Sequence, residues 1–256
     1  MDNEKYYESF DWNSFNKLPI NAKNILNLIP KDVKNIIDIG CGNGLITNIL
    51  HEKGFDVLGV DRSENALKFV KSPILKSNCD SIQVKDKSFD LVLSSELLEH
   101  LEDDVFKKTL NEFDRISSKY ILISVPNKES LSKGILQCPN CKTEFHNCYH
   151  QRTFDILKFK NLYPEYEVLD SNVCGTKVRS YNSFLSKIKF KLVSPQYWEA
   201  YYWTKKVRHN PFCPNCETKI DMKTKYNFIS IILDVINSII SPKRPFHLVV
   251  LLQKKQ

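Results

Sequence analysis

Three of the seven glycines in the chain lie within five residues, at Gly40, Gly42 and Gly44. They follow the apolar segment 33–39, which is typical of a buried strand, and they precede the segment 45–53, whose apolar residues have helical spacing. Glycine permits positive φ and lets the backbone approach a ligand closely, and the N-terminus of a following helix can receive an anionic group. The sequence therefore predicts a ligand-binding turn between a strand and a helix.

Strand and helix patterns alternate along the first two-thirds of the chain, which favours a parallel sheet. Besides 33–39, strands are predicted at 56–61, 74–79, 89–95, 120–125, 166–172 and 246–252. Besides 45–53, helices are predicted at 63–70, 103–116, 153–162 and 228–240, the first of them with Ser63 as its N-cap. The predicted fold class is α/β, with a doubly wound, Rossmann-like, seven-stranded and mostly parallel sheet.

A carboxylate ends the second predicted strand. Asp61 lies 17 residues beyond Gly44, where it can accept hydrogen bonds from both hydroxyls of a ribose. Such a loop can also be a plain turn in an unliganded domain, but loop, strand–helix context and strand-end acid together favour a nucleoside-containing cofactor. The spacing is Gly-x-Gly-x-Gly and differs from the Gly-x-Gly-x-x-Gly of dinucleotide sites.

Five segments, which occur in the order of a known family, extend this pattern. At 36–44, 59–61, 87–92, 95–101 and 123–127 the chain resembles the class I S-adenosylmethionine-dependent methyltransferases of the type 11/12 kind. The resemblance covers about residues 30–175 and the final strand. It implies S-adenosylmethionine as the cofactor and methyl transfer as the reaction.

The resemblance also implies which residues hold the cofactor. Asp38 would orient the loop or hold the cofactor's amino group, Asp61 would take the ribose hydroxyls, and Asp80 would accept from the adenine amine. The full implied set is Asp38, Gly40, Cys41, Gly42, Gly44, Asp61, Arg62, Asp80, Ser81 and Ser95.

The sulfonium methyl is already activated, so the protein must mainly align the acceptor and exclude water. A general base is needed only where the acceptor loses a proton, as a hydroxyl does. The candidate catalytic residues are Glu99, His100 and His150, which follow the fourth and fifth strands. In one interpretation Glu99 and His100 shape the site, and in a second His100 or His150 is the base.

A third interpretation is a catalytic metal. Glu96, Glu99 and His100 have the spacing of one face of a helical turn, and with a later histidine they resemble the metal site of small-RNA 3′-end 2′-O-methyltransferases. This would make the protein a metal-dependent RNA methyltransferase.

Two identical Cys-Pro-Asn-Cys units, at 138–141 and 213–216, account for four of the eight cysteines. Paired Cys-x-x-Cys units are the ligand set of tetrahedral structural zinc, so we expect Zn²⁺ on Cys138, Cys141, Cys213 and Cys216, where it would clamp two insertions over the sheet. In a different arrangement His146, Cys148 or His150 completes a site with the first pair. The segments 138–146 and 150–154 resemble a zinc-containing subset of bacterial methyltransferases, and the second also resembles the substrate-side loop of ubiquinone-type O-methyltransferases.

These patterns predict a cofactor-binding core interrupted by two insertions. The predicted parts are the core at 1–127, a zinc-knuckle insertion at 128–152, more of the core at 153–176, a second insertion with a zinc knuckle and helices at 177–244, and the final core strand at 245–256.

Charge is unevenly placed along the chain. The net charge is +7, and residues 176–256 hold 15 Lys and Arg against 4 Asp and Glu. This bias fits either an anionic partner or a solvated lysine-rich surface, and Arg152 either meets an anionic substrate group or pairs with a surface acid. Aromatic and basic residues gather around Tyr197, Trp198, Tyr201 and Tyr202, a mixture that can stack on sugars or bases, lie at a lipid interface, or pack on the domain.

The remaining segments give expectations about location and assembly. We expect the helix 228–240 to be core or a dimer contact, since it is shorter than the roughly 20 residues of a spanning helix. No basic segment followed by an apolar run marks a signal peptide at the N-terminus, so we expect a cytoplasmic protein. The pattern does not specify an oligomeric state.

The sequence thus predicts a methyltransferase that acts on an oxygen of a small-molecule or glycan-type acceptor, for which an anionic group is compatible with the basic residues. A nucleic-acid acceptor is not favoured. A non-catalytic zinc-containing binding module that retains the fold is the interpretation from a different functional class.

Overall fold

The protein is described here from a computed structural model, which covers residues 7–8, 10–14, 16–193, 211–220 and 227–255. The chain divides into two compact units. The first, called the sheet unit, comprises residues 3–127, 154–176 and 245–256. The second, called the cysteine unit, comprises residues 128–153 and 177–244. The predicted aromatic-basic stretch around Tyr197, Trp198, Tyr201 and Tyr202 lies outside the described residues.

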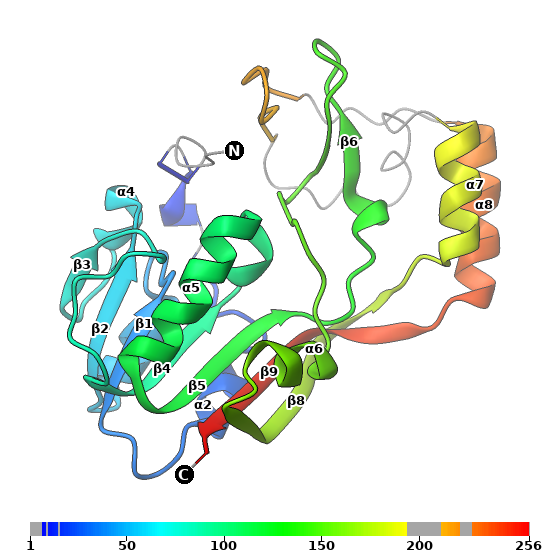
Figure 1. Cartoon of the computed structure of the whole chain (residues 1–256). Helices are drawn as coiled ribbons and strands as arrows, with labels where there is room; N and C mark the ends of the chain where they lie inside the picture. The colour runs from blue at the N-terminus through cyan, green and yellow to red at the C-terminus, as the bar shows by residue number, and fades with distance from the viewer. Residues whose placement is uncertain (1–6, 9, 15, 194–210, 221–226, 256) are drawn as a thin grey trace. The chain divides into compact units, whose positions relative to one another are not determined.

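A seven-stranded sheet forms the sheet unit, with the strand order β3-β2-β1-β4-β5-β9-β8 (Figure 1). Its strands are β1 (Asn35–Ile39), β2 (Asp56–Asp61), β3 (Ile74–Lys76), β4 (Phe89–Ser95), β5 (Ser117–Pro126), β8 (Tyr166–Arg179) and β9 (Lys243–Lys254). The pairs β3–β2, β2–β1, β1–β4 and β4–β5 are parallel, and β9 runs antiparallel to β5. The predicted fold class is confirmed, although β3 ends three residues earlier than the predicted strand 74–79.

Helices and turns connect the strands. They are η1 (Trp12–Ser14), α2 (Ala22–Leu28), α3 (Leu45–Glu52), α4 (Glu64–Leu67), η2 (Leu98–His100), α5 (Asp103–Ile116) and α6 (Ile156–Leu162). The predicted N-cap is confirmed, since Ser63 Oγ accepts a hydrogen bond from Ala66 N (3.2 Å). The helix predicted at 63–70 is shorter in the structure, and α2 was not predicted from the sequence.

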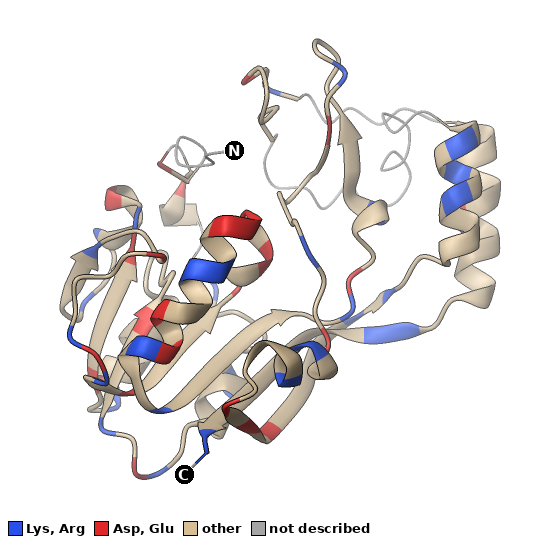
Figure 2. Ribbon diagram, viewed as in Figure 1, with Lys and Arg blue, Asp and Glu red and all other residues tan. Residues whose placement is uncertain are grey.

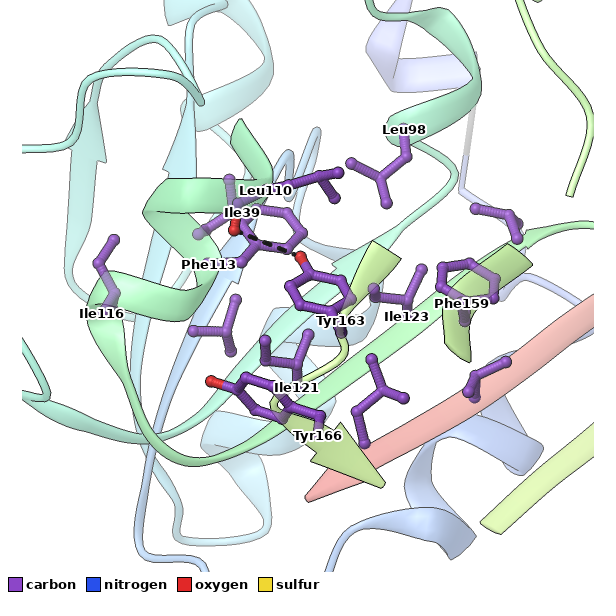
Figure 3. Packing of buried hydrophobic residues seen from close by; sticks show 14 of the residues in the cluster. Ile39, Leu98, Leu110, Phe113, Ile116, Ile121, Ile123, Phe159, Tyr163 and Tyr166 are labelled. Atoms are coloured by element: carbon purple, nitrogen blue, oxygen red, sulfur yellow. Dashed lines mark hydrogen bonds between the residues drawn. The ribbon is translucent and has the colours of Figure 1, made fainter. Parts of the chain in front are cut away.

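Side chains that alternate along each strand face two separate cores, because successive residues of a strand point to opposite faces of the sheet. Ile37 and Ile39 belong to the core that includes α5 and α6, whereas Ile36 belongs to the core that includes α2 and α3. Figure 3 shows the first core, in which Phe113 and Tyr163 are buried and the Tyr163 hydroxyl donates to Leu110 O (3.5 Å). The sheet is therefore covered by helices on both faces.

The strand order reverses between β1 and β4, which are neighbours although two strands separate them in the sequence. In open α/β sheets ligands bind at the carboxyl ends of the strands beside such a reversal. The glycine loop follows β1 and Ser95 ends β4. The topology therefore brings two of the predicted cofactor-binding segments to the same edge of the sheet.

The cysteine unit contains a small hairpin and two longer helices. Its elements are η3 (Leu131–Gly134), β6 (Ile135–Gln137), β7 (Glu144–His146), α7 (Ser183–Leu192) and α8 (Phe228–Ile240). The hairpin and α7 were not predicted, whereas α8 has the predicted bounds. Within the described parts of the chain, no helix is both long and apolar enough to cross a membrane.

Candidate functional site

The glycine loop is held against the end of β2 by backbone hydrogen bonds. Gly40 N and Cys41 N both donate to Val60 O, at 2.8 and 3.0 Å. Gly40, Gly42 and Gly44 all have positive φ, at 78°, 54° and 75°. This is the left-handed region, which glycine enters without the steric cost that a side chain would add. The backbone conformation of this turn therefore favours glycine at these three positions, as predicted.

Asp61 fixes the same loop through its side chain. Its Oδ2 accepts from Gly42 N (2.8 Å) and its Oδ1 accepts from Ser63 N (2.9 Å). Burial raises the pKa of the carboxyl group, against the lowering effect of these backbone donors. Because a carboxylate has about four lone-pair sites, each oxygen can accept a further hydrogen bond from a ligand.

Asp38 lies behind the loop and is buried. Its Oδ2 accepts from Thr47 Oγ1 on α3 at 2.6 Å. Burial raises the pKa of Asp38 to about 7; the Thr47 hydrogen bond opposes this rise, and the Asp61 charge adds to it. At neutral pH this carboxyl group therefore lies close to the midpoint of its titration.

Aromatic residues near the N-terminus lie beside the loop, and the sequence pattern did not identify them. The side chain of Trp12 packs so closely on Gly42 that a Cβ atom there would lie 3.1 Å from Trp12 Cζ3. Asn43 Nδ2 donates to Trp12 O (3.2 Å), and the Trp12 indole donates to Tyr7 O (2.9 Å). The Tyr7 ring lies 5.5 Å from the guanidinium carbon of Arg62. These contacts place two aromatic rings beside predicted cofactor-binding residues.

The predicted adenine-side residues follow β3. Asp80 is half-buried and Ser81 is exposed, in the turn after the strand that pairs with β2. Cys79 beside them contacts Thr109 of α5 through its sulfur (3.3 Å), and burial raises the pKa of its thiol. These residues are thus one strand further from the glycine loop than Asp61.

A polar cluster lies at the carboxyl ends of β4 and β5. Glu96 Oε1 accepts from Ser124 Oγ (3.2 Å) and lies 3.1 Å from His247 Nδ1. Asn21 Nδ2 donates to Ser124 Oγ (2.7 Å), and Ser95 Oγ lies 3.4 Å from the same nitrogen. Of these residues only Ser95 and Glu96 were identified from the sequence. The others come from segments too distant in the sequence for any spacing rule to connect them.

Glu96 does not share a helical turn with Glu99 and His100, which corrects the prediction from their spacing. Its φ is 55°, and its backbone N–H donates to Ser124 O (2.8 Å), so it turns the chain before η2 begins. Glu99 is buried, and His100 Nε2 lies 3.9 Å from Glu99 Oε1. Among the described residues, Glu96 belongs to no group of three potential metal ligands.

In the cysteine unit, His150 pairs with a carboxylate that the sequence pattern did not identify. Its Nδ1 forms a short hydrogen bond with Glu129 Oε2. The His146 ring stacks on the His150 ring, with centroids 4.8 Å apart. His146 Nδ1 accepts from the backbone N–H groups of Cys148 and His150, so its proton is on Nε2. Burial, together with the smaller effect of His150, lowers the pKa of His146 to about 3, so His146 is neutral.

The four Cys-Pro-Asn-Cys cysteines meet in one cluster. Their sulfur atoms all lie within 4.8 Å of one another, with Cys138–Cys216 and Cys141–Cys213 both at 3.5 Å. These distances are far longer than the roughly 2.05 Å of a disulfide bond. The donor set of four sulfurs is the one that tetrahedral zinc takes in closed structural sites.

The two cysteine turns have equivalent backbones. Cys138 N donates to Thr143 O (2.9 Å), and in the second turn Cys213 N donates to Thr218 O (2.8 Å). A side-chain hydrogen bond with Thr143 lowers the pKa of Cys141 to about 5, and one with Thr218 lowers the pKa of Cys216. Both turns thus favour a thiolate on their second cysteine.

Comparison with known proteins relates part of the sheet unit to a known family. Residues 37–120 match a family model described as a methyltransferase domain. The matched segment runs from β1 into β5 and includes the glycine loop, Asp61 and Ser95. Residues 37–120 are thus similar to a methyltransferase domain.

Several relatives resemble parts of the chain. A Methanocaldococcus jannaschii protein named as uncharacterized is 35% identical over 132 residues, which cover 50% of this chain and 56% of that protein. A ubiquinone biosynthesis O-methyltransferase of Coxiella burnetii is 32% identical over 108 residues, which cover 36% and 46%. The chain thus spans about half the length of these curated relatives.

A solved structure shares the fold over the full length. The crystal structure of a SAM-dependent methyltransferase from Archaeoglobus fulgidus aligns over 98% of this chain and 97% of that chain, with a TM-score of 0.55 and 19% identity. The two proteins therefore share their fold.

The raised pKa of Asp38 predicts a stability that depends on pH. An aspartate that ionises near pH 4 in the unfolded chain but near pH 7 in the folded one stabilises the fold below pH 4, and this stabilisation is lost as pH rises to 7. Relative to Asp38→Asn, which cannot ionise, the wild type should therefore lose up to about 4 kcal/mol of unfolding free energy across that range. Urea denaturation at several pH values measures the difference, and a constant difference would contradict the prediction.

Proposed function

We propose that the protein is an S-adenosylmethionine-dependent methyltransferase that methylates an oxygen of a small-molecule or glycan-type acceptor. The observation that carries the cofactor assignment is the hydrogen bond from Gly42 N to Asp61 Oδ2, because it joins the glycine loop to the strand-end acid. A ribose beside this pair would find a carboxylate already oriented by backbone donors. Asp38, Gly40, Cys41, Gly44, Arg62, Asp80, Ser81 and Ser95 complete the proposed cofactor-binding set.

The aromatic residues beside the loop support the same cofactor. Trp12 packs on Gly42 and Tyr7 lies beside Arg62, so apolar ring surface is available where the nucleoside would lie. Rings at such a position exclude water from a bound sulfonium compound, and they can interact with its positive charge through their π faces. We therefore add Trp12 and Tyr7 to the proposed binding residues.

An oxygen acceptor needs a general base, and we assign this role to His150. Glu129 hydrogen-bonds His150 Nδ1, which places the ring proton there and the basic lone pair on Nε2. Nε2 would take the hydroxyl proton as the acceptor oxygen attacks the methyl group and the sulfur leaves with the bonding electrons. His146 is not suited to this role, because its ring is buried, its lowered pKa makes it a weak base, and its Nδ1 lone pair already accepts from backbone N–H groups. The O-methyltransferase activity named for the Coxiella burnetii relative agrees with an oxygen acceptor.

Glu99 and His100 have a different proposed role. Glu99 is buried in the turn after β4, which suggests that the pair shapes the site rather than exchanging protons with the acceptor. The rival function, metal-dependent RNA methylation, would need Glu96 beside them as a ligand. Glu96 instead bonds Ser124 and lies beside His247, which does not support a metal site that includes Glu96.

We further propose that Cys138, Cys141, Cys213 and Cys216 bind one structural Zn²⁺. Four thiolate ligands leave no open position for substrate, so the metal would stabilise the unit and take no part in the chemistry. The cysteines come from two insertions separated by the core segment 154–176, which makes the metal a cross-link between distant parts of the chain.

Cofactor binding tests the enzymatic assignment. Titration calorimetry should detect both S-adenosylmethionine and its demethylated product, and Asp61→Ala should weaken binding at least about tenfold because charge-assisted hydrogen bonds to the ribose are lost. Asp56→Ala, at the exposed other end of β2, is the matched control and should bind normally. If the wild type binds neither compound, the protein is a non-catalytic module. Methyl-labelled cofactor incubated with fractionated cell extract then identifies the acceptor class.

The base assignment predicts a selective loss of rate. With the labelled fraction as acceptor, His150→Asn should lower the initial rate by about 10² to 10⁴, the usual contribution of a general base, and should leave cofactor affinity unchanged. Glu129→Gln should cause a smaller loss. His51→Asn changes an exposed histidine of α3 and serves as control. A His150→Asn enzyme of normal rate would exclude His150 as the base.

Metal analysis tests the zinc site. The purified protein should contain about one zinc per chain, and Cys138→Ser should lose it, with lower thermal stability, because the other three ligands bind much less tightly. Cys148→Ser is the matched control, since this exposed cysteine lies in the same unit outside the cluster. Retention of stoichiometric zinc by Cys138→Ser, or its loss from Cys148→Ser, would refute the four-cysteine site.

A further inference from the structure

Helix α8 is built with its polar side inward. Ser230, Asp234 and Asn237 recur at three- or four-residue spacing, which places them on one face, and all three are buried. Asp234 Oδ1 receives hydrogen bonds from Tyr181 OH (2.7 Å) and Lys189 Nζ (2.8 Å). The polar face of α8 therefore packs on α7 and on the segment that precedes it.

Asn237 adds to the buried polar contacts that Asp234 makes with α7 and the segment before it, and we call these contacts the polar seam. Its Oδ1 accepts from Asn182 N (2.8 Å) and from Ser241 Oγ (2.7 Å), and its Nδ2 donates to Ser180 O (3.1 Å). Buried polar groups stabilise a structure only when such partners are present. Since these partners are present, the polar groups on the inward face of α8 have the hydrogen bonds that their burial requires.

The opposite face of α8 is apolar and exposed. Phe228 is 77% exposed and Ile239 is 78% exposed, and five further large apolar residues of this helix are exposed as well. They are Ile229, Ile232, Val235, Ile236 and Ile240. Residues at these spacings form one continuous stripe. A helix on the surface of a soluble domain has the reverse arrangement, so this face requires a partner.

The segments around the apolar stripe are basic. Lys187 and Lys191 of α7 are exposed, as are Lys243 and Arg244 after α8. In the described residues 177–193 and 227–244, Asp234 is the single acidic residue, and its charge is already paired with Lys189. In the ribbon of Figure 2, Lys positions lie along α7, and no Asp or Glu position is seen on the visible part of either helix.

The positive charge around the apolar stripe indicates which kind of partner covers it. If two copies of the chain met through this face about a twofold axis, lysines of both copies would be brought together, and these segments offer no exposed acid to pair with them. A bilayer with anionic headgroups supplies both an apolar layer for the α8 stripe and negative charge for the lysines, whose long stems can reach the headgroups. We propose that α7 and α8 dock the protein on the surface of an anionic lipid bilayer, with α8 lying in the interface.

This proposal is independent of the methyl-transfer chemistry and of zinc. The direct test is co-sedimentation of the full-length protein with vesicles of phosphatidylcholine that contain about one third phosphatidylglycerol. The protein should bind these vesicles, bind phosphatidylcholine alone at least about tenfold less, and lose most binding at high salt, because the headgroup attraction is screened.

Variants distinguish vesicle binding through the α8 face from non-specific adsorption. The double variant Ile232→Gln, Ile239→Gln should reduce vesicle binding at least about tenfold, since each change removes apolar surface from the interface. The double variant Leu157→Gln, Leu169→Gln alters exposed apolar residues of the sheet unit and should bind like the wild type. Circular dichroism verifies that each variant is folded. We expect all of them to fold, because the changed side chains are exposed.

Two results would overturn the proposal. One is that the wild type does not bind anionic vesicles, or that the double variant Ile232→Gln, Ile239→Gln binds them as well as the wild type does. The other is a dimer by light scattering that the same double variant converts to monomer while vesicle binding is absent, which would show that a second copy covers the face.

Discussion

The hydrogen bonds that β2 accepts at its carboxyl end determine the geometry of the glycine loop. The Val60 carbonyl accepts two loop N–H groups and the Asp61 carboxylate accepts a third, so the loop cannot shift without losing three hydrogen bonds together. The loop meets these acceptors only with positive φ at its glycines. Asp61 thus has two tasks, because the group proposed to bind ribose is also a structural part of the loop.

The central strands could be predicted because a parallel sheet covered on both faces requires uninterrupted apolar segments. β1 and β5 are largely apolar in their buried parts, and the acid at the end of β2 follows from where its apolar pattern stops. The hairpin of β6 and β7 could not be predicted in the same way. Its strands have three residues each, which is too short for any periodicity to be recognised.

The polar cluster around Glu96 was less predictable for a different reason. Asn21, Ser124 and His247 surround Glu96, yet His247 is 151 residues away from it in the sequence. Only the antiparallel pairing of β9 with β5 brings this histidine to the carboxyl end of β4. The helical spacing of Glu96 with Glu99 was misleading, because Glu96 itself has a left-handed backbone conformation and so is not part of a helical turn. Spacing rules assume regular backbone, and functional turns often depart from it.

Helix α8 shows that periodicity identifies two faces of a helix without stating which one is inside. Its bounds follow from the sequence, but the expectation that its apolar side is core fails, because both hydrophobic cores of the described residues consist of sheet-unit residues. Asp234 decides the orientation. A buried carboxylate that leaves Lys189 would cost several kcal/mol, so the ion pair keeps the polar face inward and the apolar stripe outward. With so much apolar surface exposed, the cysteine unit gains little from hydrophobic burial, and small units of this kind depend on metal ligands or polar networks for stability. The polar seam supplies such a network and the proposed zinc site would supply the metal, and both leave the outer face of α8 available for a partner.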